Sequence, residues 1–203
     1  MARGTFITFE GIDGSGKSTV AKRVARRLEA RGVRTVLTCE PTKTWLGDAV
    51  KASYEKEVSP FTELLLFLAD RATHTENIKG WLGEGRVVIC DRYSDSTFAY
   101  QSVSLEGALR RVTSDPIRWL EDVSRPFVLR PDLTVLLAVD PSVSLERIRR
   151  KGTKFEKRGY LTKVAEAYME LARRDPKRFV VVDASKPLPE VLAVSLDAVL
   201  RVV

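Results

Sequence analysis

Apolar residues along the chain follow two kinds of pattern, short β-type runs and longer stretches with helical spacing. Runs rich in Val, Ile, Thr and Phe predict five strands. These strands are expected at residues 5–10, 34–39, 86–90, 133–139 and 179–182. Between them, apolar residues three or four positions apart predict helices. The helices are expected at residues 18–31, 64–82, 143–150, a segment ending near 173, and 189–200.

Strands that alternate with helices predict an α/β fold, a three-layer sandwich with a five-stranded parallel sheet flanked by helices. The run at 133–139 is apolar on both faces, which is typical of a parallel strand covered on both sides. No repeat or linker divides the chain, so we expect a single domain, residues 1–203. Ligands bind beyond the carboxyl ends of such strands. The residues expected at these ends are Gly11, Glu40, Asp91, Asp140 and Asp183.

The composition, with 44% hydrophobic and 30% charged residues, excludes a disordered or fibrous chain. Cys39 and Cys90 lie far apart and His74 is the only histidine, so neither a zinc site nor a disulfide framework is expected. The short apolar run at the N-terminus and the lack of an 18-residue apolar stretch predict a cytoplasmic protein.

The formal net charge of +7 is compatible with nucleic acid, an anionic membrane or small phosphorylated ligands, and charge alone does not choose among them. One Asn (Asn77) and one Gln (Gln101) beside 34 Lys and Arg residues resemble the amide-poor usage of thermophiles. Gln101 therefore stands out as a residue to examine.

The segment GIDGSGKST at 11–19 matches the phosphate-binding pattern G-x-x-x-x-G-K-S/T and lies between the first strand and the first helix. Lys17 is expected on the β- and γ-phosphates of a nucleoside triphosphate, and Ser18 on Mg²⁺. An ordinary Gly-rich turn is the alternative, which this context disfavours. A short chain of this kind best fits a compact kinase. The expected ATP-binding residues are Gly11, Ile12, Asp13, Gly14, Ser15, Gly16, Lys17, Ser18 and Thr19.

The third strand is followed by DRYSDSTFAYQ at 91–101. Asp91 is placed where an acidic group can hold Mg²⁺ or its waters, and Arg92 presents a planar fork suited to a phosphate. The alternative is that Asp91 and Arg92 form an ordinary surface salt bridge. Their position beside the phosphate-binding loop favours binding of metal and phosphate instead.

Several segments together match one family. The signature DR-(Y/F/H)-x-x-S-(S/T)-x-A-(Y/F) is matched at 91–100 and followed by Gln101, and Glu40–Pro41 follows the second strand. The other segments are LLLFLADR at 64–71, RPDLTVLLAVDPSVSLERI at 130–148 and VVDASK at 181–186. From residue 5 to about 187 the chain resembles the thymidylate kinases, a family of P-loop nucleoside monophosphate kinases.

The resemblance implies phosphorylation of dTMP to dTDP by MgATP, in a homodimer whose contact is expected at the helices after the first and third strands. It assigns the deoxyribose 3′-hydroxyl to Asp13, the acceptor phosphate to Arg92, and the sugar C2′ region to Tyr100. The resemblance implies that Phe67 stacks on thymine, although the spacing of Phe67 taken alone indicates helix core. It also implies that Arg71 and Gln101 form hydrogen bonds with the edge of the base. It places adenine near Ser185 and Lys186. The expected dTMP-binding residues are Asp13, Glu40, Phe67, Arg71, Arg92, Ser96, Thr97, Tyr100 and Gln101.

Residues 147–160 form a basic, glycine-punctuated segment that is expected to act as a short lid. Bacterial family members carry Gly in the phosphate loop where the yeast and human type carries Arg, and their catalytic arginine lies in the lid. Gly14 resembles the bacterial pattern. Arg149 is favoured as the catalytic arginine and Arg147 is assigned to adenine, while a solvated basic helix end is the alternative. The candidates in the lid are Arg149, Arg150, Lys151, Lys154 and Arg158.

Three departures from the family pattern leave a broader substrate range open. The lid's usual Arg-x-Glu is replaced by 154–156 (KFE), and 102–104 (SVS) follow Gln101 where glycines are common. The segment 42–44 (TKT) replaces a frequent glycine pair and lacks a phosphate-binding arginine, leaving Lys43 or Lys51 as its replacement.

Two rival functions remain at this point. A deoxynucleoside kinase attacks with a neutral hydroxyl and needs a general base, a position that Glu40 fits, and other nucleoside monophosphate kinases share the same parts. A P-loop nucleic-acid-binding protein without catalysis would use the basic charge instead. The basic residues cluster at the lid and the first helix, which favours triphosphate binding, so neither nucleic acid nor membrane is expected as a partner.

Overall fold

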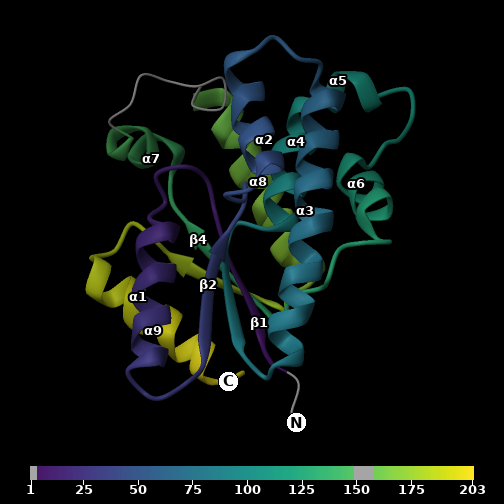
Figure 1. Cartoon of the computed structure of the whole chain (residues 1–203). Coiled ribbons are helices and arrows are strands. Elements are labelled where there is room, and N and C mark those ends of the chain that lie inside the picture. Colours follow the sequence, from purple (N-terminus) through teal and green to yellow (C-terminus); the bar gives the residue numbers. More distant parts are fainter. Residues whose placement is uncertain (1–3, 149–157) are drawn as a thin grey trace.

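The computed structural model describes residues 4–148 and 158–203, and its centre is one five-stranded parallel sheet (Figure 1). The strand order is β2-β3-β1-β4-β5, so the strand that precedes the phosphate-binding loop is central. The expected parallel sheet is confirmed. The strands are β1 (Phe6–Glu10), β2 (Thr35–Cys39), β3 (Val87–Asp91), β4 (Leu133–Ala138) and β5 (Phe179–Asp183).

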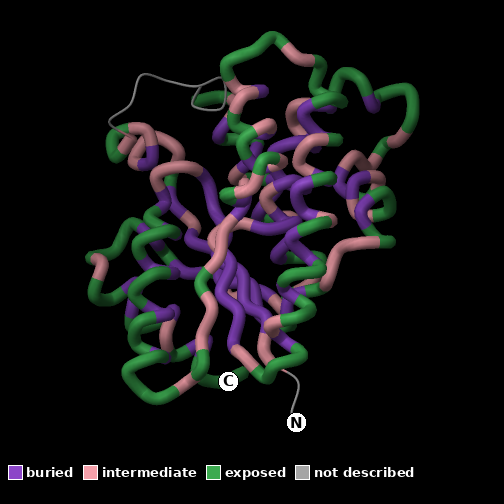
Figure 2. The backbone as a smooth tube through the Cα atoms, viewed as in Figure 1, coloured by how far each residue is buried: buried purple, intermediate pink, exposed green. Residues whose placement is uncertain are grey.

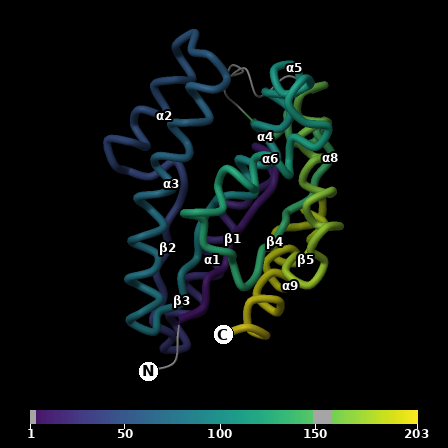
Figure 3. The backbone as a smooth tube through the Cα atoms, turned by 90° about the vertical axis from the view of Figure 1, so that its right-hand side faces the viewer, coloured from purple at the N-terminus to yellow at the C-terminus, as the bar shows by residue number. Residues whose placement is uncertain are grey.

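Helices cover both faces of the sheet, as Figures 1 and 3 show from two directions. Helices α1 (Lys17–Glu29) and α9 (Leu188–Leu200) pack on one face. Helices α3 (Pro60–Gly83) and α8 (Arg158–Arg174) pack on the other, with α4 between them. The remaining helices are α2 (Trp45–Glu55), α4 (Ser94–Ser104), α5 (Glu106–Leu109), α6 (Pro116–Ser124) and α7 (Pro141–Arg147).

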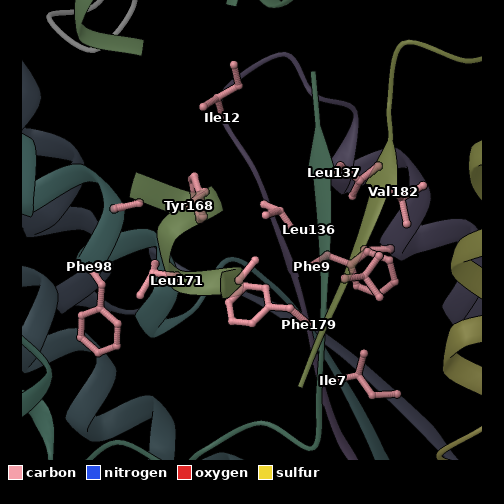
Figure 4. Close-up of a cluster of buried hydrophobic side chains, with 14 of the residues drawn as sticks. Ile7, Phe9, Ile12, Phe98, Leu136, Leu137, Tyr168, Leu171, Phe179 and Val182 are labelled. Carbon is pink, nitrogen blue, oxygen red and sulfur yellow. The ribbon is translucent and has the colours of Figure 1, made fainter. Parts of the chain in front are cut away.

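The three central strands, β1, β3 and β4, are buried over almost their whole length, whereas the edge strand β2 is only partly buried (Figure 2). Successive side chains of a strand point to opposite faces. In Figure 4, Phe9 and Leu137 therefore lie on one side of the sheet, while Leu136 faces Tyr168 and Leu171 of α8 on the other. Both faces of the sheet contribute to a continuous apolar core that fixes the strand ends in space.

Four helices were not predicted from the sequence: α2, α4, α5 and α6. Helix α4 buries polar residues such as Ser94, Thr97 and Gln101, so apolar spacing does not reveal it. Helix α3 begins at Pro60, earlier than expected, because Ser59 caps it by accepting a hydrogen bond from the Thr62 N–H at 3.1 Å. No helix within the described ranges has the length and apolar character needed to cross a bilayer.

A buried ion pair ties α4 to the segment before β5. The Arg178 guanidinium donates to both carboxylate oxygens of Asp95, at 2.6 and 3.0 Å, and to the Thr134 hydroxyl at 2.7 Å. Asp95 is fully enclosed. A single charge left without a partner in the interior is costly. Removing one member of this pair is therefore expected to lower the free energy of unfolding more than breaking an exposed pair does.

We predict that Arg178→Met lowers the free energy of unfolding by about 3–5 kcal/mol, because it leaves the Asp95 carboxylate buried without its cation. Urea unfolding of wild type and variant measures the difference. Arg118→Met, which removes an exposed 3.4 Å pair with Asp122, is the matched control and should cost less than about 1 kcal/mol. Equal losses in the two variants would contradict the prediction.

Candidate active site

The phosphate-binding loop, residues 11–19, connects β1 to α1 at the carboxyl end of the sheet (Figure 1). Gly16 has φ of 91° and directly precedes the helix. Among the described residues no side chain caps α1, so its first backbone N–H groups are available to an anion. The loop therefore has the geometry of a phosphate cradle.

Gly14 is the point where this loop contacts α7. A Cβ atom built at Gly14, which has φ of 77°, would lie 2.5 Å from the Ser144 carbonyl oxygen and 3.1 Å from Ile148 Cγ1. The Ser144 hydroxyl also donates to the Asp13 carbonyl oxygen. The close approach of α7 leaves no room for an arginine side chain at position 14.

Lys17 reaches back across the loop. Its Nζ donates to the Ile12 carbonyl at 3.3 Å and lies 3.9 Å from Asp13 Oδ1. Burial, together with the nearby Arg92 cation, lowers the pKa of Lys17 to about 8. The amine is therefore cationic at neutral pH but loses its proton more readily than an exposed lysine.

Arg92 connects the end of β3 to the phosphate-binding loop. Its backbone adopts φ of 70°, which is uncommon for a residue with a side chain and typical of functional sites. The guanidinium donates to Asp13 Oδ1 at 2.6 Å and to the Gly11 carbonyl at 3.1 Å, and it lies over the Tyr100 ring. Burial alone would raise the pKa of the Asp13 carboxyl, but the neighbouring cations Arg92 and Lys17 outweigh it and lower this pKa to about 2. A cationic fork is thus fixed beside the loop.

A buried carboxylate lies behind Arg92. Glu10, the last residue of β1, accepts hydrogen bonds from the Ser96 hydroxyl at 2.6 Å and the Tyr168 hydroxyl at 3.0 Å. The Ser96 hydroxyl accepts in turn from Arg92 at 3.1 Å. Burial, and then repulsion from Asp95, raise the pKa of Glu10 to about 7. Glu10 therefore holds two of the hydroxyl groups that position the Arg92 fork.

A cavity of about 290 Å³ opens beside Arg92. Its walls combine charged groups with two aromatic rings, Tyr54 and Phe67, whose centroids are 6.4 Å apart. A concave, partly aromatic site with a few directed polar groups is typical of small-molecule binding. The lining residues are Asp13, Glu40, Pro41, Tyr54, Phe67, Arg92, Ser96, Thr97, Tyr100 and Gln101.

Comparisons with known proteins agree with this geometry. A family model described as thymidylate kinase matches residues 9–194. A probable thymidylate kinase of Methanosarcina barkeri is 45% identical over 188 residues, which are 91% of this chain and 90% of that protein. The chain belongs to the thymidylate kinase family. Probable thymidylate kinases of Methanococcoides burtonii and Methanospirillum hungatei are 40% and 43% identical, over 99% and 95% of this chain and 98% and 92% of those proteins.

The structure brings eight of the nine residues predicted to bind dTMP to the wall of one cavity. The ninth, Arg71, lies behind that wall with 1% of its surface exposed. Its Nε and a terminal nitrogen donate to Glu40 Oε2 at 2.9 and 2.6 Å, and its other terminal nitrogen donates to the Thr97 hydroxyl at 2.8 Å. His74 pairs with Glu40 Oε1 at 2.8 Å. Arg71 thus supports two cavity residues, and its contact with the base stays a prediction.

The residues predicted to hold Mg²⁺ meet beside the phosphate-binding loop. Asp91 is the last residue of β3, and Ser18 lies in the first turn of α1. Asp91 Oδ1 is buried and accepts no hydrogen bond from the described residues, which leaves it available to a metal ion or its water. In phosphoryl-transfer sites Mg²⁺ is usually bound through one or two protein oxygens plus phosphates. This donor set fits the metal.

On the adenine side, Arg147 at the end of α7 donates to the Ala184 carbonyl at 2.9 Å. The neighbouring Ser185 hydroxyl and N–H both donate to Asp183, while Lys186 is exposed. Helix α7 is therefore linked to the connection after β5, where the nucleotide base was expected. Four of the proposed lid cations, Arg149, Arg150, Lys151 and Lys154, lie outside the described residues; Arg158 is the exposed first residue of α8.

Two tyrosines of the site, and the buried Glu10 at the end of β1, were missed in the sequence. Tyr54 lies in α2, a helix that apolar spacing did not predict, and Tyr168 follows the apolar spacing of α8 and so reads as ordinary core. Tyr168 contacts both Glu10 and Arg92 through its hydroxyl, at 3.0 and 3.4 Å. No motif marks either tyrosine, and only the folded arrangement reveals them.

The lowered pKa of Lys17 predicts a pH dependence. Because the amine holds phosphates only when protonated, kcat/KM for ATP should decline as pH rises through about 8. Initial rates over a pH series measure this limb. Lys17→Arg keeps the charge and should remove the decline even if it lowers the rate. A wild-type profile that stays level well above this pH would contradict the prediction.

Proposed function

We propose that this protein transfers the γ-phosphoryl group of ATP to dTMP, giving dTDP and ADP. The observation that carries the proposal is the cavity beside Arg92, which gathers the predicted dTMP residues next to a phosphate-binding loop. Family membership supports the same reaction.

The mechanism depends on positioning and on cations. The acceptor phosphate is already an anion, so the reaction needs no general base. Arg92 binds that phosphate with its planar fork, and Lys17 with the first N–H groups of α1 binds the ATP phosphates. Asp13, the partner of Arg92 in this structure, then becomes free to accept a hydrogen bond from the 3′-hydroxyl of the sugar. The two bound phosphates approach each other in a site that stabilises the developing charge.

Mg²⁺ belongs to the proposal as the cofactor that accompanies ATP. Ser18 and Asp91 would hold it, directly or through water. The metal neutralises charge on the phosphate oxygens when it is bound. The proposed catalytic residues are Lys17, Arg92, Asp91, Arg149 and Arg150, of which the two lid arginines rest on the family resemblance.

The state of Glu40 argues against a deoxynucleoside kinase. A general base must be free to accept a proton from the attacking hydroxyl. Glu40 instead receives two hydrogen bonds from Arg71 on one oxygen, and its other oxygen pairs with His74. A carboxylate held in this way supports the cavity wall and is poorly placed to act as a base.

We also propose that the enzyme is a cytoplasmic homodimer, as the family resemblance implies. The contact expected from the resemblance, at the helices after the first and third strands (α1 and α4), stays a prediction. Exposed apolar side chains lie on α2 and α3 after the second strand, with Trp45 76% and Leu65 62% exposed, and supply a further surface that an interface could cover. We predict a molar mass of twice 22.8 kDa in solution. Light scattering during gel filtration measures it, and a value of one chain mass would contradict the dimer.

The reaction is tested by its choice of base. Wild-type enzyme with MgATP should use dTMP and dUMP with kcat/KM values that differ by about tenfold, because one methyl group separates them. The monophosphates dCMP and dGMP should be about a thousandfold poorer, since they leave buried polar groups unpaired. Gln101→Ala should erode the preference of thymine over cytosine more than it slows dTMP.

Coupled assays of ADP release against these four monophosphates and thymidine measure the preference. Omission of Mg²⁺ is the control for the metal. A wild-type enzyme that prefers dCMP, dGMP or free thymidine would overturn the proposed function.

A further inference from the structure

Gln101 enters the cavity with its orientation already set by a neighbouring carboxylate. Its side chain is 2% exposed and lines the cavity from α4, while Glu63, 1% exposed, belongs to the first turn of α3. The two helices pack against each other (Figure 1). Gln101 Nε2 donates to Glu63 Oε1 at 3.4 Å. This is a hydrogen bond between two buried side chains at the edge of the cavity.

The chemistry of the pair decides which end of the amide faces inward. A glutamine amide donates through its nitrogen and accepts through its oxygen, whereas an ionised carboxylate only accepts. Glu63 therefore favours the rotamer with Nε2 toward itself. Within the described part of the chain, Gln101 Oε1 accepts no hydrogen bond, so the acceptor end is left for a ligand.

The opposite rotamer is disfavoured. A half-turn of the amide would place Oε1 against the Glu63 carboxylate, which brings two acceptors together with no proton between them. In a buried site such a contact also removes the hydrogen bond of the amide nitrogen. Without the Glu63 carboxylate, Gln101 could present either a donor or an acceptor to the bound base.

Pyrimidine bases differ at the position that this amide would read. N3 of thymine and uracil carries a hydrogen and donates, whereas N3 of cytosine is a bare acceptor. We propose that Glu63 is a positioning residue that makes Gln101 an acceptor for N3–H and thereby excludes cytosine nucleotides. This inference rests on the proposed function and names a residue that sets its base selectivity.

The test compares wild type with Glu63→Gln, a change of nearly equal size that supplies both a donor and an acceptor. The ratio of kcat/KM for dTMP to that for dCMP should fall by about tenfold or more, because the Gln101 amide can now turn. The value for dTMP should change by less than about threefold. The dTMP-to-dUMP ratio should stay constant, since both bases carry N3–H.

Two further variants separate positioning from a general structural effect. Glu76→Gln makes the same change at an exposed position of the same helix and should leave all ratios unchanged. In the Gln101→Ala background, Glu63→Gln should have no further effect on the dTMP-to-dCMP ratio, because its partner is absent. If Glu63→Gln fails to fold, Glu63→Met removes the carboxylate with similar length and should lower the same ratio.

The outcomes distinguish a failure of the role of Glu63 from a failure of the proposed dTMP kinase activity. An enzyme that uses dTMP, with the same dTMP-to-dCMP ratio in wild type and folded Glu63→Gln, overturns the role of Glu63 alone. A fall of the ratio that persists in the Gln101→Ala background also overturns it, since Glu63 would then act by another route. A wild-type enzyme that fails to phosphorylate dTMP overturns the proposed function and this inference with it.

Discussion

The site depends on the parallel pairing of β1 with β3. In this register Phe9 lies opposite Asp91, so the two strand ends finish side by side. The Arg92 N–H donates to the Phe9 carbonyl at 3.0 Å, and the residue then turns into a positive φ that returns its side chain over the loop after β1. The proposed acceptor-binding residue is thus joined to the phosphate-binding loop, and its strained backbone is held by a hydrogen bond to β1.

Three buried carboxylates around the cavity each accept hydrogen bonds from a neighbouring polar side chain. Glu10 holds hydroxyl groups that contact Arg92, Glu40 holds Arg71, and Glu63 holds the amide of Gln101. Glu10 and Glu63 lie behind the cavity wall, whereas Glu40 is part of the wall and is itself held by Arg71 from behind. An ionised carboxylate only accepts hydrogen bonds and so fixes the direction of each one that it receives. Glu10, whose pKa is raised to about 7, has this effect in its ionised form. Arg71 lies behind the wall, so of the three partners it is Arg92 and Gln101 that line the cavity.

Sequence patterns predicted the features that depend on local backbone geometry. They predicted less well the features that depend on which side chains pack together after folding. The five strands and the phosphate-binding loop were predictable, since apolar runs and glycine spacing reflect local geometry. The strand order, helix α4 and the contacts of Glu63 were not, because they depend on side chains that meet only after folding. Arg71 shows the difference: the motif was recognised, but its pairing with Glu40 became visible only in three dimensions.

The contact between Gly14 and Ser144 links the phosphate-binding loop to the connection after β5 through α7. Any side chain at position 14 would meet the backbone of α7, and backbone cannot move aside as a flexible side chain can. A residue with a side chain at position 14 would therefore require α7 to move away from the loop. Arg147 at the end of α7 holds the Ala184 carbonyl, so such a shift would also disturb the connection after β5.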